Sequence, residues 1–272
     1  MSTLTLDHPT DLGARPAPGP LRALRHAVAL AGRSLVKTAR TPEALIDVTI
    51  QPVIFLLLFT YIFGGALGGG DRAQYLQYLV PGLLGQSIAL AGVSLGTNLN
   101  TDIGKGVFDR FRSLPIARSA PLVGAVLADV VRYLILFCFL MGFAYLIGFR
   151  IQTGPLELLA ALGVSMAFAL SFCWLSVLVG MLVRTPGAVQ GLMFLLVLPL
   201  SFGSNVFVDA STMPGWLQDF VAVNPITHLV GVVRGLLLDG PVAHDLAWTG
   251  GWIAVFLAVF VPLALRAYNR RA

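Results

Sequence analysis

One segment of the chain places small and polar residues at a spacing that enzymes use. Gly92-Val93-Ser94-Leu95-Gly96 matches G-x-S-x-G, in which the serine hydroxyl is the nucleophile of a hydrolase. That chemistry needs a turn between a strand and a helix and a histidine base nearby. Ser94 instead lies in a long uncharged stretch, and only His228 is remotely placed as a partner. Small residues at this spacing on a membrane helix usually permit close helix packing, as does the similar segment 187–191, so we predict no catalytic residue.

The sequence also lacks a nucleotide site and a metal site of its own. A P-loop requires G-x-x-x-x-G-K-[ST], so that backbone N–H groups cradle phosphates, but Leu99 stands where Gly104-Lys105 would need the first glycine. No group of histidines, cysteines and carboxylates has the spacing of metal ligands. The histidines are scattered over the chain: His8, His26, His228 and His244. We therefore expect this chain to bind no cofactor and no metal.

The composition indicates that membrane-spanning helices position any functional residue in this chain. Only 11% of the 272 residues are charged and 57% are hydrophobic, whereas soluble domains carry about 25% charged residues. The charged residues cluster between long uncharged runs, and the 29 glycines and 16 prolines show no period. This pattern excludes a soluble globular domain, a collagen-like chain and a disordered chain. It predicts an all-α polytopic membrane protein.

Six uncharged runs are long enough to span a membrane, which takes about 20 residues because a helix rises about 1.5 Å per residue. A further stretch, 220–233, is too short for a crossing and contains Asn224-Pro225. We expect it to form a re-entrant hairpin or interfacial segment between spans five and six. The predicted spans together form a transmembrane domain over 46–267: 46–67, 76–100, 121–148, 157–182, 187–207 and 246–266.

The distribution of positive charge predicts the orientation of these spans. Fourteen of the 18 lysines and arginines fall on the side of the two termini, and three fall on the other side. Cytoplasmic loops carry the excess of positive charge, so both termini are predicted to be cytoplasmic. Residues 1–20 are rich in proline and polar residues, which predicts a disordered tail. Residues 268–272 are predicted to be a short cytoplasmic tail.

Two cytoplasmic segments are amphipathic. Residues 21–40 place basic and apolar residues on opposite sides of a helix, which predicts an interfacial helix that anchors the first span or grips a soluble partner. The loop between spans two and three also carries apolar residues at helical spacing beside mixed charge, and Pro115 ends it. This loop either docks against another protein or is a surface turn that keeps positive charge inside. Its candidate partner-binding residues are Asp102, Lys105, Val107, Phe108, Asp109, Arg110, Phe111, Arg112, Leu114 and Pro115.

The predicted spans contain few polar residues. Asp129 and Arg132 are three residues apart on one helix face, so they can form an ion pair that either orients span three or takes part in gating. The other polar residues are uncharged, which disfavours a carrier driven by protons through membrane carboxylates. They could line a route for an amphipathic solute or bond one helix to another. The candidates for lining a pathway are Gln51, Gln86, Asn98, Gln190, Ser204 and Asn205.

Several motifs together resemble the ABC-2 type exporter permeases. Residues 40–45 with Gln51-Pro52 resemble the start of that family, and 106–118 resemble its cytoplasmic coupling helix, which ends in Leu-Pro-x-x-Arg. Asn224-Pro225-Ile226-Thr227, followed by Arg234-Gly235-Leu236-Leu237, is similar to the closing Asn-Pro motif before the last span. The likeness extends over 21–271. It is greatest for the daunorubicin-resistance group of drug-export permeases.

The resemblance implies a six-span permease in a bacterial plasma membrane that pairs with itself or a paralogue. Two separate ATP-binding cassette ATPase subunits would bind ATP and Mg²⁺ and push on the coupling helix. The cargo would be a hydrophobic or amphipathic small molecule, such as a drug, antibiotic or lipid, leaving the cytoplasm or the inner leaflet. Nucleic acid is not an expected partner, whereas membrane lipid is. The alternatives are a secondary multidrug transporter driven by an ion gradient, and a membrane enzyme that uses Ser94 or His228.

Overall fold

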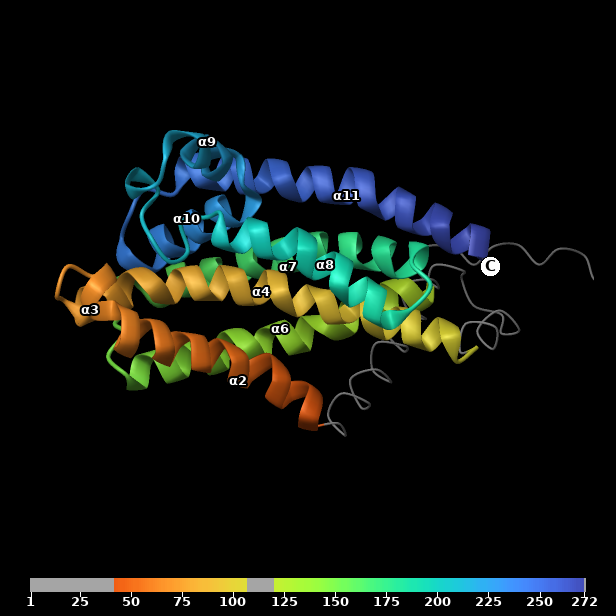
Figure 1. Ribbon diagram of the computed structural model, residues 1–272, viewed down its shortest axis with the longest axis horizontal. Coiled ribbons are helices and arrows are strands. Elements are labelled where there is room, and N and C mark those ends of the chain that lie inside the picture. The colour runs from red at the N-terminus through yellow and green to blue at the C-terminus, as the bar shows by residue number, and fades with distance from the viewer. Residues whose placement is uncertain (1–41, 107–119, 272) are drawn as a thin grey trace, which may run out of the picture.

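The computed structural model describes residues 42–106 and 120–271, with side chains for all of these except 42–48, 120, 121, 128, 269 and 271. Every regular element in this part of the chain is a helix (Figure 1). In chain order these are α2 (Pro42–Leu58), the π-helical turn η1 (Phe59–Phe63), α3 (Gly64–Leu67), α4 (Arg72–Gly104), α6 (Ala120–Leu146), α7 (Pro155–Leu182), α8 (Pro186–Phe202), the 3₁₀ turn η2 (Ala210–Thr212), α9 (Gly215–Val223), α10 (Pro225–Leu238) and α11 (Ala243–Arg271).

Three predicted segments lie outside the described residues. They are the tail over 1–20, the amphipathic helix over 21–40 and the part of the loop that contains Val107, Phe108, Asp109, Arg110, Phe111, Arg112, Leu114 and Pro115. Helix α2 begins at Pro42, four residues before the first predicted span. Proline suits this place because its missing N–H needs no partner in a first helical turn.

Five helical segments are long and apolar enough to cross a membrane: Thr49–Leu67, Arg72–Gly104, Leu122–Leu146, Pro155–Leu182 and Ala243–Tyr268. They coincide with five of the six predicted spans. The remaining prediction, 187–207, corresponds to α8, which has 17 residues and ends at Phe202. At about 1.5 Å per residue it is about 26 Å long, slightly less than the hydrocarbon thickness of about 30 Å. The bent pair α9–α10 is the structure's other candidate for a sixth crossing.

Helix α4 is the centre of the bundle. Helices α2, α6, α7, α8 and α10 all pack against it, and Figure 1 shows it between α8 and α6 along most of its length. Of its most apolar stretch, 89% is buried, compared with 11% for α11. It also has the lowest mean hydropathy of the five long segments. A helix covered by other helices presents little surface to lipid, so it can carry the polar residues that a lipid-facing helix avoids.

Small residues bring α4 and α7 close together. A side chain on Gly96 would collide with the backbone of Ser176, and one on Gly180 would collide with the backbone of Gly96. The backbone N–H of Gly96 donates to the Ser176 hydroxyl at 3.0 Å, and that hydroxyl lies 3.2 Å from the Val93 carbonyl, to which it donates. The interpretation of the segment 92–96 as a packing motif is therefore confirmed at Gly96. The same interpretation of the segment 187–191 is wrong for this chain, because a side chain added to Gly187 or Gly191 would meet nothing within 4 Å.

The two ends of the bundle differ. The end that holds α3, α9 and α10, here called the hairpin end, lies opposite the end of α4 and the C-terminus (Figure 1). Helices α9 and α10 meet at 73°, where Asn224 caps α10 by accepting from the backbone N–H of Ile226 at 2.9 Å. At the other end α11 continues to Arg271, so the tail predicted from residue 268 is helical as far as that residue.

Candidate functional site

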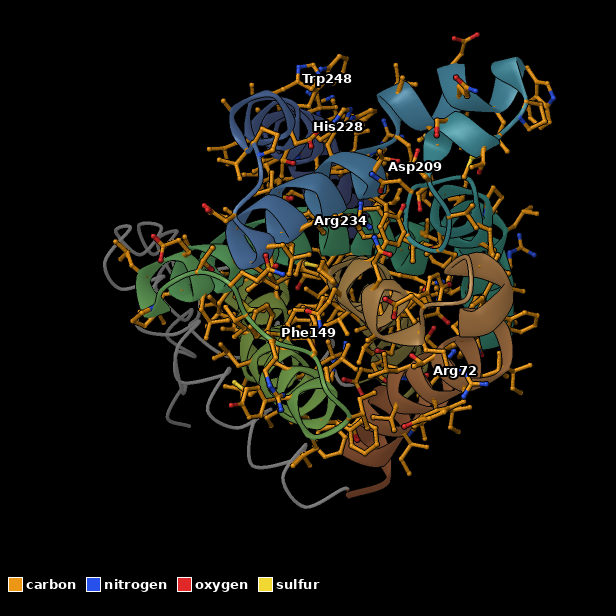
Figure 2. The ribbon with its side chains drawn as sticks, turned by 90° about the vertical axis from the view of Figure 1, so that its left-hand side faces the viewer. Arg72, Phe149, Asp209, His228, Arg234 and Trp248 are labelled. Carbon is orange, nitrogen blue, oxygen red and sulfur yellow. The ribbon has the colours of Figure 1, made fainter. Side chains whose placement is uncertain are left out.

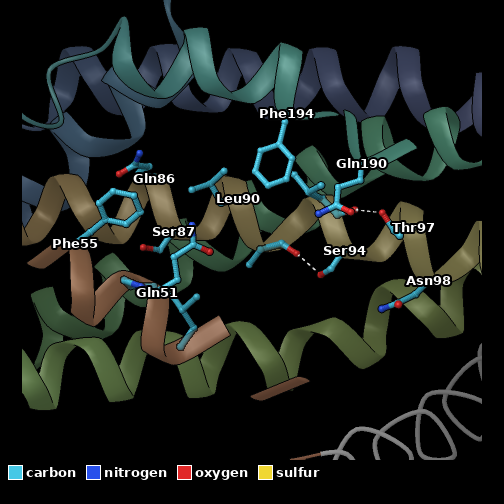
Figure 3. Close-up of a pocket in the computed structure, with 14 residues that line it drawn as sticks. Gln51, Phe55, Gln86, Ser87, Leu90, Ser94, Thr97, Asn98, Gln190 and Phe194 are labelled. Carbon is cyan, nitrogen blue, oxygen red and sulfur yellow. Dashed lines mark hydrogen bonds between the residues drawn. The ribbon is translucent and has the colours of Figure 1, made fainter. Parts of the chain in front are cut away.

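A cavity of about 260 Å³ lies beside α4, between α2 on one side and α8 on the other (Figure 3). One residue of α6, Leu136, closes part of its wall. Because α4 is central, the cavity lies within the membrane-spanning part of the bundle. The contributions of the other helices are Gln51, Pro52 and Phe55 from α2, eight residues between Gln86 and Asn98 from α4, and Gln190 and Phe194 from α8.

Four of the residues predicted from sequence to line a pathway meet in this cavity: Gln51, Gln86, Asn98 and Gln190 (Figure 3). They come from three helices and span 139 positions of the sequence. Within the described part of the chain, none of their side-chain amides makes a hydrogen bond to another residue. Gln86 is only 2% exposed. A carboxamide offers two donors and one acceptor oxygen, so the cavity holds unpaired hydrogen-bonding capacity in an apolar surrounding.

Apolar and hydroxyl groups complete the lining. Phe55, Leu90 and Phe194 face the amides, as Figure 3 shows. The Ser94 hydroxyl donates to the Ala91 carbonyl at 2.9 Å, and the Thr97 hydroxyl lies 3.4 Å from the Val93 carbonyl, to which it donates. Such bonds to the preceding turn are common for hydroxyls inside helices. Mixed aromatic, aliphatic and carboxamide groups suit a ligand that is largely apolar with a few polar atoms.

Two other predicted pathway residues do not line this cavity. Ser204 and Asn205 lie in the turn after α8, at the hairpin end. The Ser204 hydroxyl donates to the Ser201 carbonyl at 2.5 Å. The Asn205 carbonyl accepts from the Tyr78 hydroxyl at 2.8 Å and from Arg234 at 3.0 Å. The backbone of this turn therefore fastens α4 and α10 to each other.

Arg234 of α10, labelled in Figure 2, makes contacts with both α4 and this turn. Its guanidinium lies 3.9 Å from the centroid of the Tyr78 ring and donates to the Tyr78 carbonyl at 3.2 Å as well as to Asn205. A desolvated cation over an aromatic face contributes about 2 kcal/mol. Asp209 lies nearby, where the backbone N–H of Ser211 donates to its carboxylate at 2.8 Å and lowers the pKa of that carboxyl. Arg234 thus holds three segments of the hairpin end together.

The structure brings Asp129 and Arg132 together. Arg132 donates to the Asp129 carboxylate at 2.9 Å and to the Ala91 carbonyl at 2.6 Å, and both charged side chains are buried. Ala91 lines the cavity, so this pair connects α6 to the part of α4 that forms the cavity wall.

The structure describes two of the residues predicted to bind a partner, Asp102 and Lys105, at the end of α4. The backbone N–H of Lys105 donates to the Thr101 carbonyl at 3.1 Å, and Asp102 lies in the last turn. The docking role of their loop stays a prediction.

The structure also brings together residues that sequence reasoning left apart. His228 and His244 were expected to be scattered, but their ring centroids lie 6.0 Å apart, and Asp245 lies 2.9 Å from His228. No periodic spacing in the sequence indicates this cluster. It arises because α10 and α11, joined by a short turn, pack side by side at the hairpin end.

The chain is similar to known membrane transport proteins over most of its length. Residues 25–238 match the ABC-2 type transporter family. The daunorubicin resistance ABC transporter permease protein DrrB1 of Streptomyces coeruleorubidus is 39% identical over 245 residues, which are 88% of this chain and 84% of that protein. The probable doxorubicin resistance ABC transporter permease protein DrrC of Mycobacterium tuberculosis is 26% identical over 88% of this chain and 86% of its own length.

A more distant relative shows how far the similarity extends. The inner membrane transport permease YadH of Escherichia coli is 24% identical over 79% of this chain and 84% of its own length. The family match covers α2 through α10, including the helices that line the cavity and the Asn224-Pro225 bend. The chain belongs to the ABC-2 type transporter family of multi-span membrane permeases.

Proposed function

We propose that this chain is the permease subunit of an ATP-driven exporter that moves a hydrophobic or amphipathic small molecule out of the cytoplasm or the inner leaflet. The observation that carries the proposal is the cavity beside α4, in which four carboxamides have no described intramolecular partner. Unpaired polar groups at membrane depth are costly, which favours a functional role for them. Family membership supports transport as that role.

In this proposal six helices cross the membrane, with α8 as the fifth crossing and α9–α10 as a re-entrant hairpin on the outer side. The 73° bend at Asn224-Pro225 supports a segment that enters the membrane and returns. The end of α4, the turn between α7 and α8 and the C-terminus lie opposite the hairpin end (Figure 1). Lys105 directly follows α4 and Arg184 belongs to that turn, which agrees with an excess of cytoplasmic positive charge. Both termini are then cytoplasmic, and the membrane is a bacterial plasma membrane.

The energy would come from two copies of a separate ATP-binding cassette ATPase, which bind ATP and Mg²⁺. The chain has no P-loop sequence, and the relatives are named as permease proteins of ABC transporters. We assign the contact with the ATPase to Asp102, in the last turn of α4, and to the loop that begins at Lys105 and continues through Phe108 and Phe111. This loop follows α4 directly, so a push on it would be transmitted to the helix that forms most of the cavity wall.

The size of the cavity supports a dimer. Pockets for drug-sized ligands measure about 300–1,000 Å³, whereas the cavity in this chain measures about 260 Å³. A second copy, or a paralogue, facing α2 and α8 would enlarge the space between the two chains. Exposed apolar residues on those helices, such as Ile54 at 54% and Leu195 at 69%, would be covered by that partner or by lipid. The relatives named for daunorubicin and doxorubicin resistance support planar amphipathic drugs as cargo.

The test is transport in proteoliposomes that contain the permease and a candidate ATPase encoded beside it. Anthracyclines, other hydrophobic antibiotics and lipids are screened for stimulation of ATP hydrolysis and for uptake into inverted vesicles. We expect Gln86→Leu and Gln190→Leu to lower kcat/KM for transport by about 5- to 150-fold each, because a lost buried hydrogen bond costs about 1–3 kcal/mol. The matched control is Gln74→Leu, the same change at an exposed position of α4.

Three results would each contradict a part of the proposal. Transport that survives depletion of ATP and collapses with a protonophore would identify a carrier driven by an ion gradient. Equal transport by Gln74→Leu, Gln86→Leu and Gln190→Leu would show that the cavity is not on the pathway. To test the contact with the ATPase, Phe108→Asp and Phe111→Asp are combined, and the proposal requires loss of the co-purified ATPase.

A further inference from the structure

A cluster at the hairpin end, formed by His228, His244 and Asp245, plays no part in the proposed pathway. His228 lies on α10, and the other two residues lie in the first turn of α11. One ligand atom from each of the three lies within 4.8 Å of the others. Figure 2 shows His228 beside Trp248 of α11, away from Arg234. His228 is buried, whereas His244 is exposed, so the cluster is accessible from the surface.

The hydrogen bonds of His228 determine which of its ring nitrogens could bind a ligand. Its Nε2 lies 3.0 Å from the Ala222 carbonyl oxygen, which only accepts, so Nε2 carries a proton and donates it there. Its Nδ1 lies 2.9 Å from the Asp245 carboxylate. In the neutral ring Nδ1 has a lone pair, so a nitrogen lone pair and a carboxylate oxygen face each other. A cation, either a proton or a metal ion, must lie between them.

Packing holds both partners in this arrangement. The ring of Trp248 stacks on that of His228, with centroids 4.9 Å apart and planes at 5°. Asp245 can approach because Gly231 has no side chain, since a methyl group there would collide with the Asp245 carboxylate. A histidine that binds a metal usually donates its other N–H to a carbonyl or carboxylate, which fixes its orientation. The bond from His228 to Ala222 is of this kind.

We propose that His228, His244 and Asp245 bind a divalent transition-metal ion of the Zn²⁺ class at the hairpin end. Two imidazoles and one carboxylate are borderline ligands that Zn²⁺ prefers, with water as the fourth ligand of a tetrahedron. In such a site the ligand atoms lie about 3.4 Å apart, since each is about 2.0–2.1 Å from the metal. The His228–Asp245 distance is already near this value. The separations that involve His244 reach at most 4.8 Å, so its ring must turn inward by up to about 1.4 Å to bind the metal, which its exposure permits.

A metal at this position would connect three elements. It would join α10 to α11 directly and, through the bond from His228 to Ala222, would also hold the end of α9. Trp252 of α11 already donates to the Val223 carbonyl at 3.2 Å. Binding would therefore stabilise the hairpin end against α11, and the melting temperature would rise with the concentration of free metal.

The experiment uses the full chain in detergent or nanodiscs, purified with a tag that contains no histidine and stripped with a chelator. Zn²⁺ is titrated by calorimetry, with melting temperature as a second readout and Mg²⁺ as a hard-cation control. We expect one Zn²⁺ per chain, no response to Mg²⁺, and at least about a 10-fold loss of affinity in His244→Ala and in Asp245→Asn. His8→Ala, which removes an imidazole elsewhere in the chain, should bind as wild type does.

His244→Cys provides a test that does not depend on folding defects, because a thiolate is also a zinc ligand and should restore binding relative to His244→Ala. Gly231→Ala should weaken binding by displacing Asp245. Absence of stoichiometric Zn²⁺ binding, or equal affinity in wild type and His244→Ala, would overturn the proposal and leave a proton between His228 and Asp245. These measurements need neither ATPase nor transported substrate, so their failure is independent of the proposed transport function.

Discussion

The buried pair Asp129–Arg132 allows the energy of a membrane-depth ion pair to be measured. Asp129→Asn keeps the shape of the side chain but removes its negative charge, and Arg132, which is 6% exposed, then keeps only the Ala91 carbonyl and a neutral amide as acceptors. Arg132→Met removes the opposite charge and leaves the carboxylate buried. Each single change therefore leaves one uncompensated charge between α6 and α4.

The expected cost follows from that uncompensated charge. Removing one partner of a buried pair usually destabilises a protein by about 3–5 kcal/mol. The double variant Asp129→Asn/Arg132→Met has no buried charge, so it should lose only about 1–2 kcal/mol, for a polar group without a partner. The interaction energy from the double-mutant cycle should then be about 4 kcal/mol or more in magnitude.

The assay is reversible unfolding in mixed micelles, followed by tryptophan fluorescence, on the wild type, the two single variants and the double variant. Asp219→Asn is the matched control, since Asp219 is exposed on α9, and this change should alter stability by less than about 0.5 kcal/mol. Interaction energy below about 0.5 kcal/mol would refute the reasoning. It would mean that water or a rearranged neighbour solvates the charge left behind.

The same variants also separate the two roles that the sequence left open for this pair. If the pair only orients α6, the folded double variant should transport nearly as well as the wild type. If the pair takes part in gating, the double variant should fold and yet fail to transport. Stability and transport are therefore measured on the same preparations.

Two further predictions concern packing and capping. Gly96→Val should lower stability by more than about 3 kcal/mol in the same unfolding assay, because the added side chain meets the rigid backbone of α7 rather than a movable side chain. The control is Gly191→Val, which meets nothing within 4 Å and should have little effect. Equal losses of stability in the two variants would contradict this prediction. Asn224→Ala should cost about 2–3 kcal/mol, since it removes the cap of α10 and leaves the carbonyls of Leu200 and Gly203 without their donor at 2.7 Å. Asn98→Ala, which breaks no described hydrogen bond, is the control, and an equal loss there would count against the capping argument.

Charge-free runs predict the long helices well because lipid imposes a simple rule: a crossing segment carries few charges. The ends of α4, α6, α7 and α11 lie within a few residues of the predicted ends, apart from the C-terminal end of α11, where the helix continues past Arg266. The rule fails for α8, where the uncharged run continues to Asp209 but the helix ends at Phe202. That end depends on Asn224, which bonds the carbonyls of Leu200 and Gly203 from a distant part of the chain.

The polar residues of the spans could be predicted as a set, but their arrangement could not. Gln51 and Gln190 meet beside α4 only because α2 and α8 pack on the same part of it. Asn205 was predicted on the same ground, as an uncharged polar residue in a long apolar run, yet it lies in the turn at the hairpin end. One sequence gives the periodicity of each helix but not the neighbour that each face meets. The cluster of His228 with His244 has the same explanation, since it depends on the packing of α10 against α11.

The helices that pack against α4 are not all held in the same way. Hydrogen bonds join α4 to α7, through Ser176 and through Asn100, whose amide donates to the Gly180 carbonyl at 2.9 Å. The described contacts of α8 are apolar instead, through Val189, Met193 and Val197. Apolar contact is non-directional, so a helix held by it can shift without breaking a directed bond. Displacement of α8 breaks no described hydrogen bond to α4, and Asn224 holds α8 only at Leu200, near the hairpin end. In the proposed transport cycle, a swing of α8 about that end would widen the cavity, and the amide of Gln190 would move with it.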